Sequence, residues 1–257
     1  MMNSLIEFQE DEICYTLTLN RPERHNSLVP ELLEALIERL DFVAESVPSL
    51  PVILNAKGRS FSTGGDILGF YQNRDDLVNY STKLVGLLNE TMLRMLNLQV
   101  PIIAAVHGIV TGGSIGLILA TDILLLTPAA SFTPYYGILG FSPDGGWTAI
   151  LPAIIGSKRV SEILLYNKTI QAEDALNWGL CTRIVPDDVI QQEARKIAQE
   201  ITKQKQGSTR TTKVLLNASI EEFESKLQKE RDLFITQIQT EEAMQGITSF
   251  LNISNKP

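Results

Sequence analysis

Cysteine is almost absent from this chain, which holds only Cys14 and Cys181 among its 257 residues. The two lie far apart and form no CxxC or CxxH pair, so the sequence predicts no disulfide framework. Each thiol has the character of a small buried hydrophobe in a reducing compartment. We therefore expect a cytoplasmic protein.

Metal-binding and nucleotide-binding patterns are missing as well. His25 and His107 are the only histidines, and no HxxxH or clustered carboxylate spacing occurs, so no metal site is predicted. The glycine segments contain neither GxxxxGK[ST] nor GxGxxG. Nucleotide hydrolysis and dinucleotide binding are therefore disfavoured.

Positive charge and long apolar runs are also scarce. The chain has 22 Lys and Arg against 30 Asp and Glu, a net charge of −8, which disfavours nucleic-acid binding because phosphate contacts need a basic surface. The longest apolar stretch, residues 115–126, is interrupted by Thr121 and Asp122 and is too short to span a bilayer. Residues 1–12 have no apolar signal-peptide core. We expect no nucleic-acid partner and no membrane association.

The chain does carry a regular alternation of strand and helix patterns. Residues 13–19 alternate between two faces, and Pro30 opens a segment with apolar residues at helical spacing. Further strands are predicted at 51–55, 101–106 and 122–127, with helices between them at 77–98 and after 112–113. Strands that alternate with helices favour an α/β fold.

From residue 145 onward the sequence is mainly helical. Helices are predicted at 147–155, 158–166, 172–178, 187–203 and 220–240. We place a boundary near residue 195, between a core of residues 1–195 and a helical region of residues 196–257. Phe223, Leu227, Leu233, Phe234 and Ile238 lie at near-helical spacing, and they should pack against other subunits or against the chain's own core.

Two glycine loops, residues 60–67 and 107–114, each precede a predicted helix. Glycine allows backbone shapes that bulkier residues forbid, and the first N–H groups of a helix lack partners inside it. One free N–H from each loop could bind the same oxygen atom and form an oxyanion hole. Each segment alone is weak evidence, because a Gly-Gly pair before a helix is more often ordinary turn chemistry.

Five segments together resemble the crotonase (enoyl-CoA hydratase/isomerase) superfamily: residues 20–28, 61–66, 107–113, 178–186 and 242–247. The resemblance covers essentially the whole chain. It implies a spiral of ββα units with C-terminal helices that form a homotrimer or a homohexamer. It also implies an acyl-CoA substrate, with coenzyme A as part of that substrate and no separate cofactor.

The same resemblance assigns site residues. Gly65 and Gly113 would supply the oxyanion-hole N–H groups. The substrate would contact the following residues: Arg24, Gly64, Asp66, Ile67, Gly112, Tyr136 and Trp147. Asp66 is also well placed to cap the helix that follows it, and Tyr136 and Trp147 could equally belong to the core.

The reaction depends on the acid–base residues. Gly116 and Tyr136 occupy the positions where hydratases of this family have glutamates, so a standard hydratase mechanism is not expected. Asp144 matches the acidic residue that moves a proton in enoyl-CoA isomerases. Its apolar neighbours, Phe141, Pro143 and Trp147, should raise its pKa. The alternative is that Asp144 only caps the next helix.

Other functions stay open at this stage. Ring-acyl or epoxide acyl-CoA isomerases carry an Asp in a very similar loop, and a hydratase could use Asp144 alone. A dehalogenase would need a histidine on the preceding long helix, and residues 87–92 contain none. A non-catalytic acyl-CoA-binding protein is the alternative of a different class.

Overall fold

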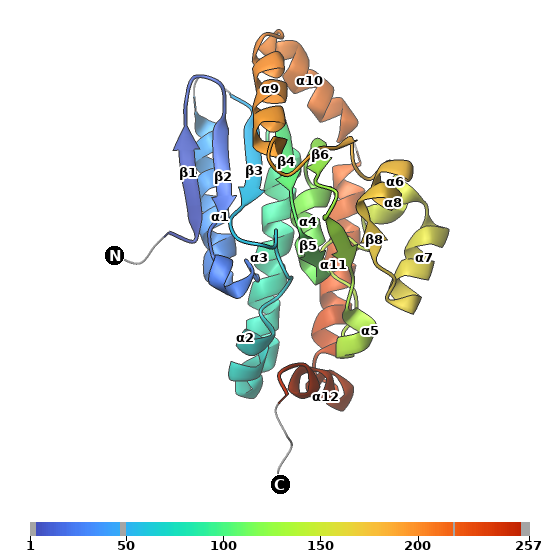
Figure 1. Cartoon of the computed structure of the whole chain (residues 1–257). Coiled ribbons are helices and arrows are strands. Elements are labelled where there is room, and N and C mark those ends of the chain that lie inside the picture. Colours follow the sequence, from blue (N-terminus) through green and yellow to red (C-terminus); the bar gives the residue numbers. More distant parts are fainter. Residues whose placement is uncertain (1–3, 47–49, 218, 253–257) are drawn as a thin grey trace.

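Six strands form the main sheet of the computed structural model, which describes residues 4–46, 50–217 and 219–252 (Figure 1). In order across the sheet they are β1 (Ile6–Glu10), β2 (Tyr15–Leu19), β3 (Val52–Ala56), β4 (Ile102–Val106), β6 (Ile123–Leu126) and β9 (Arg183–Ile184). β1 and β2 are antiparallel, and every other pair is parallel. The register aligns Leu17, Leu54, Ala104 and Leu124 in one row across β2, β3, β4 and β6.

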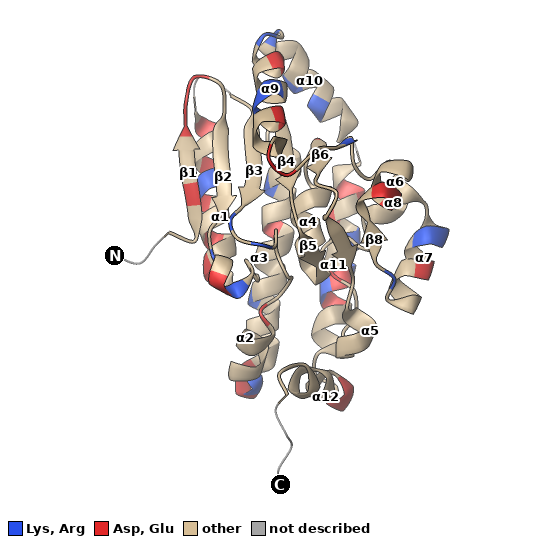
Figure 2. Ribbon diagram, viewed as in Figure 1, with Lys and Arg blue, Asp and Glu red and all other residues tan. Residues whose placement is uncertain are grey.

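Helices cover both faces of this sheet. The helices concerned are α1 (Pro30–Glu45), α3 (Leu77–Asn97) and α9 (Ile190–Thr202). Leu54 and Ala104 share a core with α1 and α3, while Ile53 and Ile103 pack with α9 on the other face, because successive strand residues point to opposite faces. β4 is buried along its whole length, and Figure 2 shows the charged residues mainly on β1 and the outer helices.

A second, smaller sheet lies beside the first. It contains β5 (Ile109–Thr111), β7 (Ser131–Thr133) and β8 (Ile170–Gln171), in that order. Shorter helices lie between the strands along the chain: α2 (Ile67–Gln72), α4 (Ile115–Leu119), α5 (Tyr136–Leu139), α6 (Leu151–Ile155), α7 (Ser157–Tyr166) and α8 (Ala172–Asn177). The expected α/β fold is confirmed. None of the described helices combines the length and apolarity needed to cross a membrane.

The C-terminal part consists of α10 (Gln206–Leu216), α11 (Ile220–Gln237) and α12 (Glu241–Phe250). α11 packs along α3, and Leu227, Phe234 and Ile238 are buried in the same core as the main sheet. These side chains therefore pack against the chain's own core, one of the two outcomes expected. The boundary expected near residue 195 falls inside α9, which runs without a break.

Several helices, α5 and α12 among them, differ from the sequence-based expectation. The helix predicted at 147–155 is only α6, because the N–H groups of Gly146, Thr148 and Ala149 donate to the carboxylate of Glu230 instead of starting a helix. α10 was not predicted. It buries Lys213, whose ammonium group binds Asp122 at 2.7 Å. Because the buried side chain of this helix is a lysine, the sequence shows no apolar stripe that would predict α10.

Candidate active site

The first glycine loop joins β3 to α2 and packs against the segment before α1. The N–H of Leu28 donates to the carbonyl of Gly64 at 2.7 Å, and the N–H of Asp66 donates to the carbonyl of Leu28 at 3.0 Å. Gly65 lies between these two bonds, so its own N–H points to the opposite side of the loop. Within the described part of the chain this N–H donates no hydrogen bond, and Gly65 lines a cavity of about 520 Å³.

The second glycine loop follows β5 and forms a 3₁₀ turn, Gly112–Ser114, before α4. Gly113 is the second residue of this turn, where an N–H has no partner inside the helix, and no hydrogen bond among residues 4–46, 50–217 and 219–252 uses it. The two loops touch through their backbones, since a Cβ at Gly64, whose φ is +73°, would lie 2.7 Å from the carbonyl oxygen of Thr111. Gly65 and Gly113 therefore reach one cavity from two adjoining loops.

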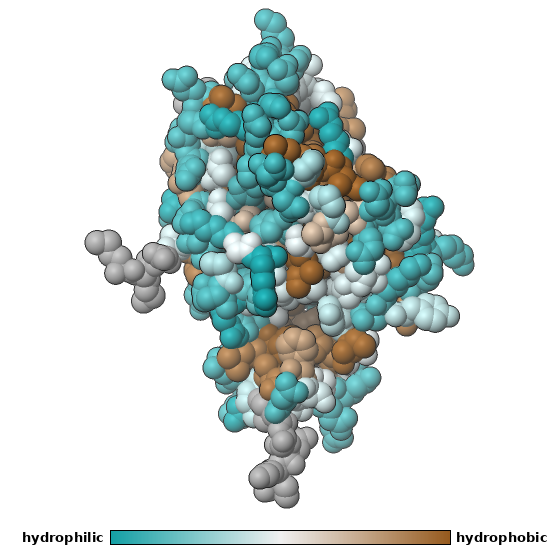
Figure 3. Space-filling view, viewed as in Figure 1, coloured by the Kyte–Doolittle hydropathy of each residue, from teal (hydrophilic) through white to brown (hydrophobic). Residues whose placement is uncertain are grey.

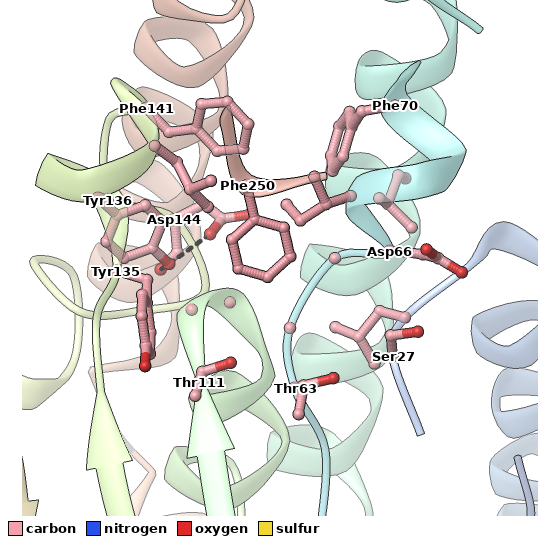
Figure 4. A pocket seen from close by; sticks show the side chains of 18 of the residues that line it. Ser27, Thr63, Asp66, Phe70, Thr111, Tyr135, Tyr136, Phe141, Asp144 and Phe250 are labelled. Carbon is pink, nitrogen blue, oxygen red and sulfur yellow. Dashed lines mark hydrogen bonds between the residues drawn. The ribbon is translucent and has the colours of Figure 1, made fainter. Parts of the chain in front are cut away.

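Asp144 lies in the loop between α5 and α6, with its carboxylate next to the second glycine. A Cβ at Gly113 would lie 2.8 Å from Oδ1 and 3.0 Å from Oδ2 of Asp144. Gly145 makes this close approach possible, because its φ is +64° and a Cβ there would lie 2.3 Å from the carbonyl oxygen of Gly113. The Tyr136 hydroxyl donates to Oδ1 at 2.6 Å (Figure 4). Asp144 caps no helix, since α6 begins only at Leu151 and has no side-chain N-cap.

Burial dominates the electrostatics of Asp144. The residue is 6% exposed, and the loss of hydration raises the pKa of its carboxyl from 3.8 to about 7. The Tyr136 hydrogen bond lowers this pKa because it favours the charged form, and the negative charge of Glu230 raises it. The upward direction predicted from the sequence is confirmed. A carboxyl that titrates near neutral pH can accept a proton and return it.

The cavity shared by these residues has an apolar wall. Its side chains come from α2, α3, α11, α12 and the loop after α5: Phe70, Leu84, Leu88, Phe141, Phe234 and Phe250. Phe70, Phe141 and Phe234 contact one another, with centroid distances of 5.5, 5.8 and 6.1 Å. Figure 3 shows apolar side chains across the lower part of this face, over α2, α5 and α12. Such a wall favours an apolar group of a ligand.

Asp66 is engaged by protein groups on the side away from the cavity. Its carboxylate accepts the N–H of Leu68 at 3.1 Å, so the expected capping of α2 is confirmed. It also forms ion pairs with Arg21 at 2.8 Å and with Arg24 at 3.0 Å. Figure 4 shows the carboxylate directed away from the cavity. Arg24 lines the cavity, but its guanidinium is held by Asp66.

The remaining residues expected at the site separate into two groups. Gly64, Ile67, Gly112 and Tyr136 line the cavity. Trp147 does not: it is fully buried, and its indole N–H donates to the carbonyl of Gly112 at 2.9 Å. Trp147 therefore belongs to the core, which is the second of the two roles expected for it. The indole ring packs under the second glycine loop and does not reach the cavity.

Sequence reasoning missed two residues near the site. Glu230 is buried behind the Asp144 loop, and Phe250 brings α12 to the cavity. Both come from C-terminal helices whose local patterns mark only a helix. The apolar spacing of α11 does hold a signal for Glu230, because this charged residue lies between the buried Leu227 and Phe234 on the inner face. No group of three or more metal-binding side chains occurs among the described residues.

The chain resembles known proteins along nearly its whole length. A sequence model described as enoyl-CoA hydratase/isomerase matches residues 9–256. The chain is 29% identical over 255 residues to 1,2-epoxyphenylacetyl-CoA isomerase of Escherichia coli, which covers 98% of this chain and 96% of that protein. It is 35% identical over 193 residues to a probable enoyl-CoA hydratase of Mycobacterium tuberculosis, which covers 72% and 66%. The crystal structure of an enoyl-CoA hydratase from Bacillus halodurans has the same fold, with a TM-score of 0.90 at 24% identity, over 96% of this chain and 100% of that one.

Proposed function

Because the chain belongs to the enoyl-CoA hydratase/isomerase family, we propose that it isomerises an acyl-CoA by moving one proton along the acyl chain. The observation that carries this proposal is the buried carboxylate of Asp144, which lines the cavity and lies against Gly113. Its pKa of about 7 suits a group that must take up and release a proton in one catalytic cycle.

The proposed reaction of a 3-enoyl thioester has two proton transfers. Asp144 Oδ2 first removes a proton from C2. The electron pair of the broken C–H bond forms a double bond between C1 and C2, and the carbonyl electrons move to the thioester oxygen. The N–H groups of Gly65 and Gly113 bind this dienolate oxygen. Asp144 then returns the proton to C4, where the electron pair of the C3–C4 double bond forms the new C–H bond. The pair between C1 and C2 moves to C2–C3, and the electrons on the oxygen re-form the carbonyl.

Two positions argue against hydration of a double bond. A Cβ at Gly116 would lie 2.5 Å from the sulfur of Met92 and 3.0 Å from the carbonyl oxygen of Gly145, so a glutamate side chain has no room there. The Tyr136 hydroxyl is committed to Asp144. A hydratase must orient a water molecule with strong acceptors, and these two positions offer none. An isomerase needs only one base that reaches two carbons.

A ring-acyl or epoxide substrate is the second candidate. The full-length similarity to 1,2-epoxyphenylacetyl-CoA isomerase supports it, as does the cavity wall, where Phe70, Phe141 and Phe250 lie around the space next to Asp144 (Figure 4). Aromatic rings pack favourably against a flat ring through offset or edge contacts. This candidate uses the same base and the same two N–H groups.

The test is a panel of 3-enoyl-, 2-enoyl- and ring-epoxide acyl-CoA esters incubated with the purified protein in deuterated water. Chromatography with mass spectrometry separates isomers, detects deuterium at C2 and detects an added water. We expect isomerisation with deuterium exchange in the wild type and neither in Asp144→Asn, while the exposed-site control Asp187→Asn behaves as the wild type. A wild-type enzyme that only adds water to 2-enoyl-CoA would overturn the proposal.

A further inference from the structure

A second buried carboxylate lies directly behind the loop that carries Asp144. Glu230 on α11 is 4% exposed. Its Oε1 accepts the N–H of Thr148 at 2.6 Å and the N–H of Ala149 at 2.9 Å, and its Oε2 accepts the N–H of Gly146 at 2.8 Å. The Thr148 hydroxyl adds a fourth bond at 2.6 Å. A buried charge is tolerated when several donors surround it.

These bonds determine the path of the loop. Three of the backbone N–H groups at residues 146–149, which would otherwise begin a helix, donate to Glu230, so α6 starts only at Leu151. Gly146 adopts a φ of +87° in this turn. Asp144 lies two positions before this anchored amide, so a change in the turn at Gly146 is transmitted directly to its carboxylate.

The carboxylate of Asp144 is held from a different element as well. The Tyr136 hydroxyl on α5 donates to its Oδ1 at 2.6 Å and to its backbone carbonyl at 3.1 Å. One oxygen is thus committed to Tyr136, and Oδ2 is left for a ligand. Oδ2 lies 3.0 Å from the position that a Cβ at Gly113 would occupy.

We propose that Glu230 and Tyr136 are positioning residues for Asp144, a role that rests on the proposed isomerase function. Glu230 anchors the loop, and Tyr136 orients the carboxylate so that one oxygen serves as the base. They also act on its charge in opposite directions, because Glu230 is an anion and Tyr136 is a donor. The α3 side chains nearest this site, Leu88 and Met92, carry no charge, and no other charged side chain in the described chain acts on Asp144.

The opposite signs give a test that does not depend on turnover. Carbon-13 NMR of aspartate carboxyls, assigned with Asp144→Asn, measures the pKa of Asp144 in each variant. Glu230→Gln removes the anion and should lower this pKa below that of the wild type. Tyr136→Phe removes the donor and should raise it. Glu224→Gln changes the net charge equally on the same helix but at an exposed site, and it should leave the titration unchanged.

Kinetics provide the second measurement. Loss of positioning should lower kcat by about 10- to 100-fold in Glu230→Gln, with a much smaller change in KM, because misplacement of a catalytic group acts mainly on the chemical step. If Glu230→Gln does not fold, Glu230→Asp retains the charge but shortens its reach. It should lower kcat while Asp144 still titrates near neutral pH.

The outcomes separate the two proposals. Unchanged titration of Asp144 in both Glu230→Gln and Tyr136→Phe, or wild-type kcat in a folded Glu230 variant, would overturn the positioning role. If the titrations shift as expected but the wild type isomerises no ester of the panel, the positioning role stands and the proposed reaction is wrong.

Discussion

At the scale of single residues, the site places a carboxylate where its charged form is unfavourable. Asp144 is buried, and its pKa of about 7 lies well above the ordinary value of 3.8. The unfolded chain has no such shift, so the folded protein binds a proton that the unfolded chain releases between these two pH values. Stability should therefore fall as the pH rises through this window and remain lower above it.

Asp144→Asn should reveal this loss of folding stability at higher pH. The variant lacks the ionisable group and keeps the shape of the side chain. Relative to the wild type, it should gain stability as the pH rises from about 5 to about 8, by roughly 3 kcal/mol at most, while it loses isomerase activity. Urea unfolding at both pH values measures the difference. The same relative stability at pH 5 and pH 8 would contradict the raised pKa, and Asp187→Asn serves as the exposed control.

Gly113 tests the contact between the second glycine loop and the base. In Gly113→Ala the new Cβ would lie within 3.0 Å of both Asp144 oxygens and of Leu88 Cδ2, so the carboxylate must shift. We expect turnover to fall by about 100-fold, since a small misplacement of a catalytic group is costly. Gly137→Ala is the control, because a Cβ there meets nothing within 4 Å. Wild-type turnover in a folded Gly113→Ala enzyme would show that the contact is unimportant.

At the scale of elements, α12 closes one side of the cavity by packing on α5. A Cβ at Gly246 would lie 2.1 Å from the carbonyl oxygen of Leu139, so the two helices meet backbone to backbone. A Cβ at Gly140, which follows α5 and has a φ of +70°, would lie 2.8 Å from Cγ of Glu242. This packing holds Phe250 at the cavity.

Gly246→Ala should therefore displace α12. We expect a loss of stability of about 1–3 kcal/mol from overpacking, and a KM for the acyl-CoA that rises several-fold, because the apolar wall loses Phe250. Thermal unfolding and steady-state kinetics measure the two effects. Gly207→Ala on α10 is the control, as a Cβ there meets nothing within 4 Å. An unchanged KM in Gly246→Ala would mean that α12 does not shape the substrate site.

At the scale of the whole molecule, large apolar side chains remain on the surface of this chain. Leu165 and Tyr166 at the end of α7 are 84% and 82% exposed, and Leu215 and Leu216 on α10 are 70% and 77% exposed. On α11, Leu227 and Phe234 are buried in the chain's own core, while Leu233 is 54% exposed. Exposed apolar side chains of this size favour burial against a partner.

We predict a homotrimer or a homohexamer that buries these side chains. Light scattering at micromolar concentration should give the mass of three or six chains, and Leu165→Glu or Leu216→Glu should lower it, because a charge in a buried interface is unfavourable. Val78→Glu introduces the same charge at another exposed apolar site and should not. A monomeric wild type would reject the prediction.

The sequence by itself determined the features that depend on neighbouring residues. The alternation in β2, the apolar spacing of α1 and α3 and the two glycine loops all follow from periodicity and backbone freedom within a few residues. The glycine loops indicated an oxyanion hole, and the resemblance to the crotonase superfamily assigned Gly65, Gly113 and Asp144 to the site. α10 was not predicted, because its buried side chain is a lysine and the helix has no buried apolar face that would indicate it in the sequence.

Only the tertiary structure decided how these candidates interact. The bond between Gly146 and Glu230 joins positions 84 residues apart, and no local pattern contains that information. The same contact shortened the predicted helix at 147–155 and placed a second carboxylate near Asp144. Burial of Trp147 under the second glycine loop likewise depends on the packing of distant segments. The charge state of Asp144 is set by desolvation and by long-range neighbours, and these exist only once the chain has folded.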